Sequence, residues 1–545
     1  MREVQLTVPA LDPAPDPKTI TKPGQLKQWV EDLPYAHPEG MAREILSTLQ
    51  RLNRHPKISP QRPELMELLL APYLNILQIF KDKILKRGSA SLHRNNKLFF
   101  DLVEKINIEM AYGYKRIIKD ELLTDLQKPP EQQAVAIYWA MYCLIQAILL
   151  ELCSYQQESR SIWRELLQLF QLATMYNIAD QPIQTNIQIT GEPPRIITEF
   201  KQILLLFSLD PLHLSLGDLW ASYTFLSHWA SIARLGRMPE RDNPMESLLV
   251  DLRGIDKIKP FSPEQKVDVK RYCLLVTSPL SKSIDHSLAF IRSHQLDKVK
   301  GLEGLSETQA QQLLQRMLLF WRAHPLRGFP RREQYDRLMV VAGIDAISDF
   351  LRKATSHAGY HHQRAHRSEE LEGTDVSTSF TPAPREIRHH THHWRQLNIS
   401  ERGIGVVVQQ SGINGFPIGQ LVLIESESAV QHTNWRLGVI RRLIQQNPAT
   451  LELGVEFLIG RAFAATLRPE VFGAERRADF LPALVLQQNE NSERVLITPP
   501  MTYRSDRQYV LETTDGETNK VLAGNLLEST GSFERFSCTQ VQLHG

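Results

Sequence analysis

The stretch N-I-S-E-R-G, residues Asn398 to Gly403, separates two strand-like runs and determines how the C-terminal third of the chain is interpreted. Trp394 to Leu397 precedes it, and Gly405 to Val408, a glycine followed by three valines, comes after it. Asn and Ser side chains cap turns, and glycine permits a positive φ or the close approach of a ligand. By itself the stretch predicts an ordinary β-turn that carries small polar groups.

Further strands are predicted on both sides of this turn. They are short runs of β-branched and aliphatic residues bounded by turn residues, which is typical of strands. These runs are Leu338–Val341, Leu421–Ile424, Trp435–Ile440, Leu451–Leu458, Ala483–Gln487, Arg494–Thr498 and Gln508–Thr513. The last ends near Asp515-Gly516, a dipeptide that favours a tight hairpin. A β-rich C-terminal third follows.

The segment R-G-F-P-R, Arg327 to Arg331, immediately precedes the first of these strands. Two guanidinium groups four residues apart can converge on one ligand, and Arg offers bidentate donors to phosphate or to the guanine edge. Pro330 stiffens the segment by restricting Phe329. Alone, such a pair arises by chance in most chains of this length and indicates only an exposed arginine cluster.

The two motifs together, followed by W-R-L-G-V-I-R-R-L at Trp435 to Leu443, resemble the PilZ family in order and chain position. The resemblance implies a six-stranded antiparallel β-barrel over residues 322–470 and a receptor for cyclic di-GMP. In such a receptor, Arg327 and Arg331 would hold the phosphates and guanine edges of the ligand. The residues implied on the opposite side of the ligand are Asn398, Ser400 and Gly403.

The distance between the two motifs departs from this family. Asn398 lies 67 positions after Arg331, which is more than two strands require. We expect an insertion at 344–393, with a helix near Gly343 to Thr355 and a histidine-rich loop after it. A long loop costs closure entropy only slowly, so the barrel is preserved, although the insertion could cover or remodel the ligand site. A competing arginine pair is R-E-I-R at Arg385 to Arg388, whose spacing is three rather than four.

The histidines of this insertion have spacings that metal ligands could also show. They are His357, His361, His362, His366, His389, His390, His392 and His393. Neither group contains H-E-x-x-H or a carboxylate that would complete a catalytic site, so a polar loop without a metal is favoured over a metal-dependent hydrolase. Phosphate-loop, nucleophile-elbow, dinucleotide-binding, GGDEF and EAL motifs are missing too. The sequence therefore predicts a binding protein with no cofactor rather than an enzyme.

Residues 22–321 are predicted to form a helical domain. Leu98, Leu102, Ile106 and Met110 recur at helical spacing, which indicates one buried face. Similar stretches are Glu64–Phe80, Ile162–Tyr176, Ile196–Phe207, Leu219–Leu235 and Thr308–Ala323. The segment Ala134 to Leu150 is almost wholly apolar and nearly long enough to cross a bilayer, but we expect a core helix because it lies among other helices that need a buried centre.

The composition limits the possible partners. The 545 residues carry a formal net charge of only +2, so the chain is not expected to bind DNA, RNA or an anionic membrane by charge alone. Four scattered cysteines fit a reducing compartment. Residues 1–21, rich in Asp and Pro, read as an extended segment without the features of a secretory signal, and we expect a cytoplasmic location.

The sequence as a whole predicts a multidomain α+β protein with a helical domain, a PilZ-like barrel and a further β segment at 475–545. The resemblance implies a cytoplasmic cyclic di-GMP effector that acts on an unidentified protein partner, with no transmembrane segment. Its architecture resembles effectors of surface attachment, type IV pili and motility. The alternative is a PilZ-like scaffold that no longer binds the nucleotide and acts through protein contacts.

Overall fold

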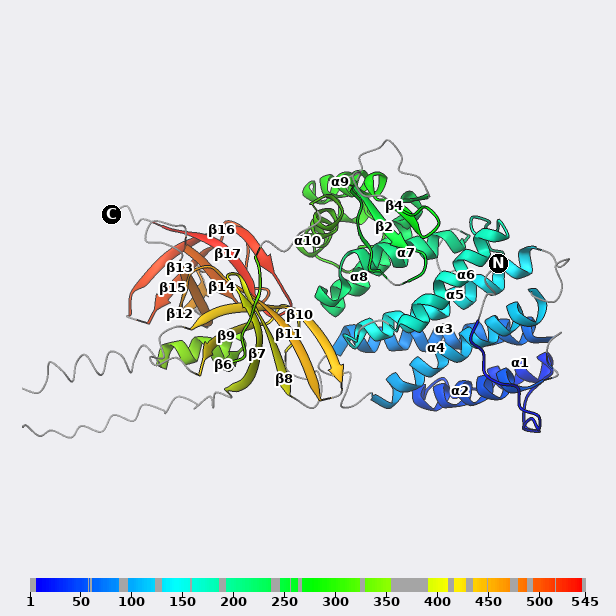
Figure 1. Cartoon of the computed structure of the whole chain (residues 1–545). Coiled ribbons are helices and arrows are strands. Elements are labelled where there is room, and N and C mark those ends of the chain that lie inside the picture. The colour runs from blue at the N-terminus through cyan, green and yellow to red at the C-terminus, as the bar shows by residue number, and fades with distance from the viewer. Residues whose placement is uncertain are drawn as a thin grey trace, which may run out of the picture. The chain divides into compact units, whose positions relative to one another are not determined.

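The computed structural model divides into two compact units, the first comprising residues 1–326 and the second residues 327–411 and 415–545 (Figure 1). Each unit is considered by itself. The structure describes residues 6–541 with the exception of 57, 59–60, 88–96, 123–129, 157–158, 186–192, 237–245, 255, 263–266, 324–328, 354–390, 410–415, 428–434, 448, 471–478, 488–493 and 515.

The first unit is mainly helical, as the periodicity predicts. Its helices are α1 (Pro23–Glu31), α2 (Pro38–Arg54), α3 (Arg62–Arg87), α4 (Lys97–Ile117), α5 (Pro130–Cys153), α6 (Arg160–Met175), α7 (Ile196–Ser208), α8 (Leu216–Trp229), α9 (Ser278–Arg292) and α10 (Glu307–Leu318). Local sequence explains several of their starts. Proline occupies the first turn of α1 and α2, and Ser306 with Gln309 forms a capping box on α10.

The apolar helix α5 lies in the core of this unit. Its segment Gln132–Cys153 is long and apolar enough to cross a membrane, yet 89% of its most apolar 18-residue stretch is buried inside the protein. It packs against α4, α6 and α7, and its aromatic side chains Tyr138, Trp139 and Tyr142 contact one another. A helix that is hydrophobic all round belongs in such a core.

A small antiparallel sheet interrupts the helices of the first unit. Its strands are β1 (Arg234–Gly236), β2 (Ser247–Asp251), β3 (Lys259–Pro260) and β4 (Tyr272–Val276), in the order β1-β4-β2-β3. The periodicity of the sequence does not predict this sheet, because β2 and β4 are short continuous apolar runs that a buried helix could also contain.

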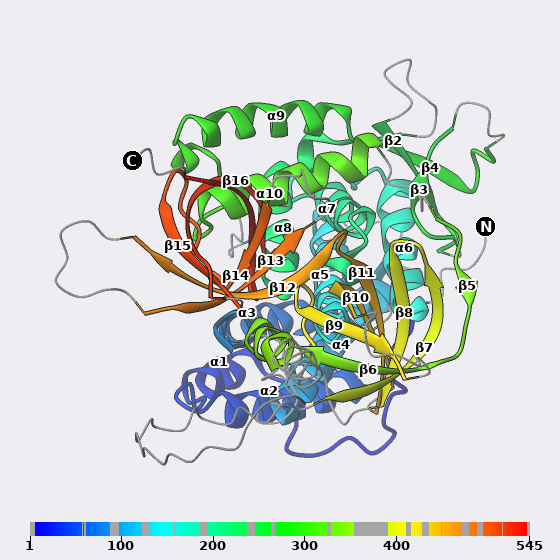
Figure 2. The same ribbon diagram turned by 90° about the vertical axis from the view of Figure 1, so that its left-hand side faces the viewer.

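The second unit contains two closed six-stranded antiparallel barrels (Figures 1 and 2). The first barrel is built from β6 (Arg337–Ala342), β7 (His392–Ser400), β8 (Gly403–Gln409), β9 (Leu421–Ser426), β10 (Arg436–Asn447) and β11 (Thr450–Phe457), and the pairing of β7 with β8 closes it. A two-residue strand, β5 (Arg332–Glu333), is added outside β7. The predicted barrel is therefore confirmed as a fold.

The second barrel holds the additional C-terminal strands. It comprises β12 (Arg461–Pro469), β13 (Leu481–Gln487), β14 (Arg494–Thr498), β15 (Gln508–Thr513), β16 (Thr518–Ser529) and β17 (Glu534–Gln540), in the closed order β12-β13-β14-β17-β16-β15. The strand β12 lies before residue 470 but belongs to this barrel, since it pairs with β13 and β15. Beyond the predicted strands, β12, β16 and β17 complete the closure.

The insertion between β6 and β7 begins with a helix at 344–353, where the sequence predicts one. Its apolar residues join the core of the second unit, with Ile347 fully buried and the Phe350 ring 4.7 Å from that of Trp435. The rest of the insertion, including the histidines from His357 to His390, lies outside the described residues. His392 and His393 belong to β7, and no metal-binding group is present among the residues that the structure describes.

A carboxyl group lies among tyrosines in the first unit. The Tyr138 hydroxyl of α5 donates a hydrogen bond to the Glu199 carboxylate of α7 at 3.3 Å. Tyr142 and Tyr223 also interact electrostatically with this carboxylate, and within the described part of the chain Glu199 makes no ion pair. Burial raises the pKa of Glu199 from 4.5 to about 7.

This shift predicts a pH-dependent stability. The folded state holds the proton more tightly than the unfolded state, so the contribution of Glu199 is fully present below about pH 4.5 and is lost as the pH rises through about 7. In the variant Glu199→Gln the side chain is neutral at every pH, and this part of the dependence disappears. Urea unfolding of parent and variant across this range measures the effect, and identical pH profiles would contradict it.

Candidate functional site

The short strand β5 brings the arginine motif to the predicted turn (Figure 2). Arg332 pairs with Ile399 and Glu333 with Asn398, so the antiparallel register places Arg331 level with Ser400. Arg331 is exposed. The insertion between the motifs therefore leaves Arg331 and the N-x-S-x-x-G turn side by side, whereas Arg327 lies outside the described residues, as do Arg385 and Arg388.

The predicted turn joins β7 to β8 as a two-residue hairpin. Asn398 pairs with Gly405 and Ser400 with Gly403, which leaves Glu401 and Arg402 at the tip. The Ser400 hydroxyl donates a hydrogen bond to the Gly403 carbonyl oxygen at 3.2 Å. Three of the predicted site residues, Asn398, Ser400 and Gly403, therefore belong to one hairpin.

Two glycines of this hairpin make room for their neighbours. A Cβ at Gly403 would lie 2.6 Å from the Val455 carbonyl oxygen of β11, and a Cβ at Gly405 would lie 2.8 Å from the Asn398 side-chain oxygen. Glycine is therefore required at Gly403 by the approach of a neighbouring strand, and at Gly405 by the Asn398 amide that packs over it.

The Asn398 amide has one acceptor that makes no hydrogen bond within the described residues. This acceptor, the side-chain oxygen, is buried. A buried acceptor without a partner costs about 1–3 kcal/mol. A ligand N–H, such as the Watson–Crick edge of guanine carries, would remove that cost if the Asn398 side chain turned outward from Gly405.

Further cations surround the turn beyond those predicted from the sequence. The Arg402 guanidinium lies 5.2 Å from the ring centre of Phe329, and Arg436 lies 3.5 Å from that of Phe457. Arg436 also donates a hydrogen bond to the Glu401 carbonyl oxygen at 2.9 Å, and burial lowers its pKa. Two arginines therefore flank the turn and can contact an anionic ligand, and the carboxylates of Glu333 and Glu401 are exposed beside them.

Phe329 and Arg402 link the two motifs directly, although the sequence does not show this. Phe329 lies in the motif R-G-F-P-R and Arg402 in N-I-S-E-R-G, so the sequence shows that each is near a candidate site residue. Their contact depends on β5 folding back onto β7, which no spacing rule reveals.

Fold and site together define a class of protein in which a helical unit precedes two closed β-barrels, the first of which carries a basic turn beside an arginine segment. Two segments of the chain match models of known protein families. Residues 24–240 match the family described as the N-terminal domain of the cyclic-di-GMP receptor FimW, and residues 470–541 match the FimW C-terminal β-barrel domain. The chain is thus similar at both ends to a family of cyclic di-GMP receptors.

The matches include the helices from α1 to α8 and the second barrel from β13 to β17. The first barrel lies between them, so its likeness to PilZ domains stays a prediction from the sequence. A comparison with curated proteins finds no match.

The close approach at Gly403 generates a stability prediction. In the variant Gly403→Ala the new methyl group would collide with the Val455 carbonyl oxygen, and separating β8 from β11 should lower the free energy of unfolding by about 1–3 kcal/mol. Thermal unfolding measures this. Gly531→Ala is the matched control, since a Cβ there meets nothing within 4 Å, and a Tm loss of equal size in both variants would refute the prediction.

Proposed function

We propose that this protein is a receptor for cyclic di-GMP and that the first barrel binds the ligand. The proposed ligand-binding residues are Arg327, Arg331, Asn398, Ser400 and Gly403. The observation that carries the proposal is the pairing of β5 with β7, which puts Arg331 beside Ser400 despite the insertion. The similarity of both chain ends to a cyclic di-GMP receptor family supports it independently.

The chemistry of the site fits the ligand. Cyclic di-GMP carries two phosphates and two guanines, and Arg331 offers a planar fork to phosphate oxygens or to the guanine O6 and N7 atoms. The Asn398 amide offers a buried acceptor without a partner in the described part of the chain. The Ser400 hydroxyl and the hairpin backbone add polar groups beside Arg331.

We also propose that the receptor has no catalytic activity and works in the cytoplasm through an unidentified protein partner. Its control of surface attachment, type IV pili or motility rests on the resemblance of the architecture alone. Transmission to the partner requires that the ligand bind two conformations of the receptor with different affinity. A scaffold that has lost the nucleotide is the outcome expected if the parent protein binds no ligand.

Calorimetric titration of the full chain with cyclic di-GMP tests the receptor function. The parent should release or absorb heat on binding, and Arg331→Ala should weaken the affinity at least ~10-fold, because a hydrogen bond to a charged group is lost. Arg494→Ala, on β14 of the second barrel, is the control and should bind as the parent does.

The titration separates the possible failures. An absence of heat for the parent would refute the receptor function. Binding that survives both Arg327→Ala and Arg331→Ala but is lost in Arg385→Ala or Arg388→Ala would move the site to the competing arginine pair.

A further inference from the structure

One apolar cluster joins the two barrels of the second unit. Strands of both barrels are buried on two faces, since their alternate residues fill the barrel interior while the others pack at the joint between the barrels. The joint residues include Val341, Leu421, Leu423, Leu437 and Val439 from the first barrel and Leu484, Leu486, Val495 and Ile497 from the second. The second barrel is therefore packed onto the first rather than tethered to it.

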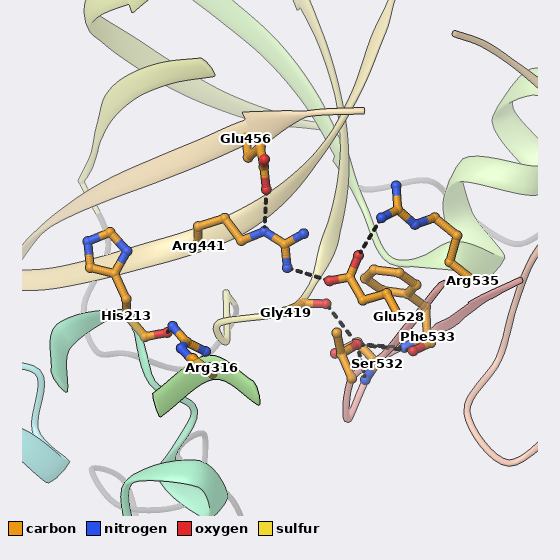
Figure 3. Close-up of polar contacts among 10 residues, drawn as sticks. His213, Arg316, Gly419, Arg441, Glu456, Glu528, Ser532, Phe533 and Arg535 are labelled. Carbon is orange, nitrogen blue, oxygen red and sulfur yellow. Dashed lines mark hydrogen bonds and ion pairs between the residues drawn. The ribbon is translucent and has the colours of Figure 1, made fainter. Parts of the chain in front are cut away.

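An ion-pair network crosses the same joint (Figure 3). Arg441 of β10 lies 2.7 Å from the Glu456 carboxylate of β11 and also binds Glu528 of β16, in the second barrel. Arg535 of β17 lies 3.3 Å from the other oxygen of Glu528. Arg441 is thus the cation that joins a carboxylate of each barrel.

Register shifts in both barrels turn the Arg441 and Glu528 side chains toward one another. The register of β10 against β11 shifts between Ile440 and Arg442, and the register of β16 against β17 shifts between Leu526 and Glu528. Such bulges re-aim a side chain that regular pairing would point elsewhere. A hydrogen bond of 3.1 Å from the Thr530 hydroxyl to the Gly419 carbonyl oxygen fixes the adjacent backbone.

The first-barrel end of this network is bonded to the candidate ligand turn. Glu456 is paired with Gly403, and the next residue, Phe457, donates its backbone N–H to the Arg402 carbonyl oxygen at 2.9 Å. On β10, Arg436 holds the Glu401 carbonyl oxygen at 2.9 Å. The two first-barrel strands of the network, β10 and β11, therefore also hold the turn.

The network is partly shielded from water. Arg441 is 32% exposed and Glu528 15% exposed. Burial alone would disfavour the charge of Arg441, but the carboxylates of Glu528 and Glu456 outweigh it and raise the pKa of the guanidinium. Removing one partner of a partly buried pair leaves the other poorly solvated, which favours rearrangement of the strands that carry them.

We infer that Arg441 is a positioning residue for cyclic di-GMP, through which the second barrel holds the N-x-S-x-x-G turn in its binding geometry. The inference rests on the proposed receptor function. Binding linkage is reciprocal, so if the joint supports the turn, ligand at the turn must also stabilise the joint. Ligand binding should accordingly slow hydrogen exchange at Glu528 and in the β16–β17 pairing.

The affinity test uses single variants of the full chain and the same calorimetric titration. Glu528→Gln, in the other barrel from the site, should weaken cyclic di-GMP binding about threefold to tenfold, and Arg441→Gln should do the same. Arg441→Lys keeps the charge and should recover most of the affinity. Arg442→Gln is the matched control, since this neighbour on β10 pairs with Glu452 of β11, within the first barrel, at 3.6 Å.

Hydrogen exchange of the parent with and without cyclic di-GMP gives the second readout, because coupling through Arg441 slows exchange in β16–β17 more than in the rest of the second barrel, whereas general stabilisation by the ligand slows both alike. Slower exchange in β16–β17, reduced in Glu528→Gln, is the expected result. If the parent binds but Glu528→Gln and Arg441→Gln keep its affinity, or if Arg442→Gln loses as much, the inference is wrong while the receptor function stands. A parent that binds no ligand overturns both.

Discussion

The arrangement of the second unit depends on β7, the strand through which the first barrel closes. One edge of β7 pairs with β6 and then β5, and the other edge pairs with β8. The barrel has no free edge at this point as a result, and the segment after Phe329 is drawn onto the strand that ends in the N-x-S-x-x-G turn. The insertion between β6 and β7 is compatible with this closure because its helix at 344–353 packs at the joint between the barrels.

A second constraint is the two-sided burial of the strands that meet at that joint. In β9 the residues from Leu421 to Ile424 are all at most 3% exposed, because one face fills the barrel and the other covers the second barrel. In β13 and β14 the residues from Ala483 to Leu486 and from Val495 to Thr498 are likewise buried on both faces, each at most 9% exposed. The joint combines this apolar contact with the charges of Arg441 and Glu528, which gives it a fixed register in addition to its burial.

Much of the fold could be predicted from the sequence, since runs such as L-V-L-I and short glycine-rich turns indicate strands. The sequence does not indicate β12 as a strand, because its alanines favour helix. It does not indicate β16 because Gly524 interrupts the pattern, and this glycine is required since a Cβ there would meet the Ser537 hydroxyl. For the candidate site, the sequence motifs singled out Arg331 and the turn, and the pairing of β5 with β7 brings these two segments together. The roles of Arg402 and Arg441 could not be predicted, because each depends on a contact between segments distant in sequence, 87 residues apart for Arg441 and Glu528.

We propose that the segment ending at Arg331 and the hairpin from Asn398 to Gly403 form one binding site. A crystal structure of the full chain with cyclic di-GMP tests it most directly. We expect a ligand phosphate or guanine edge about 3 Å from the Arg331 guanidinium, with a ligand N–H donating to the Asn398 side-chain oxygen. Ligand bound elsewhere, with the Asn398 oxygen still without a partner, would contradict it.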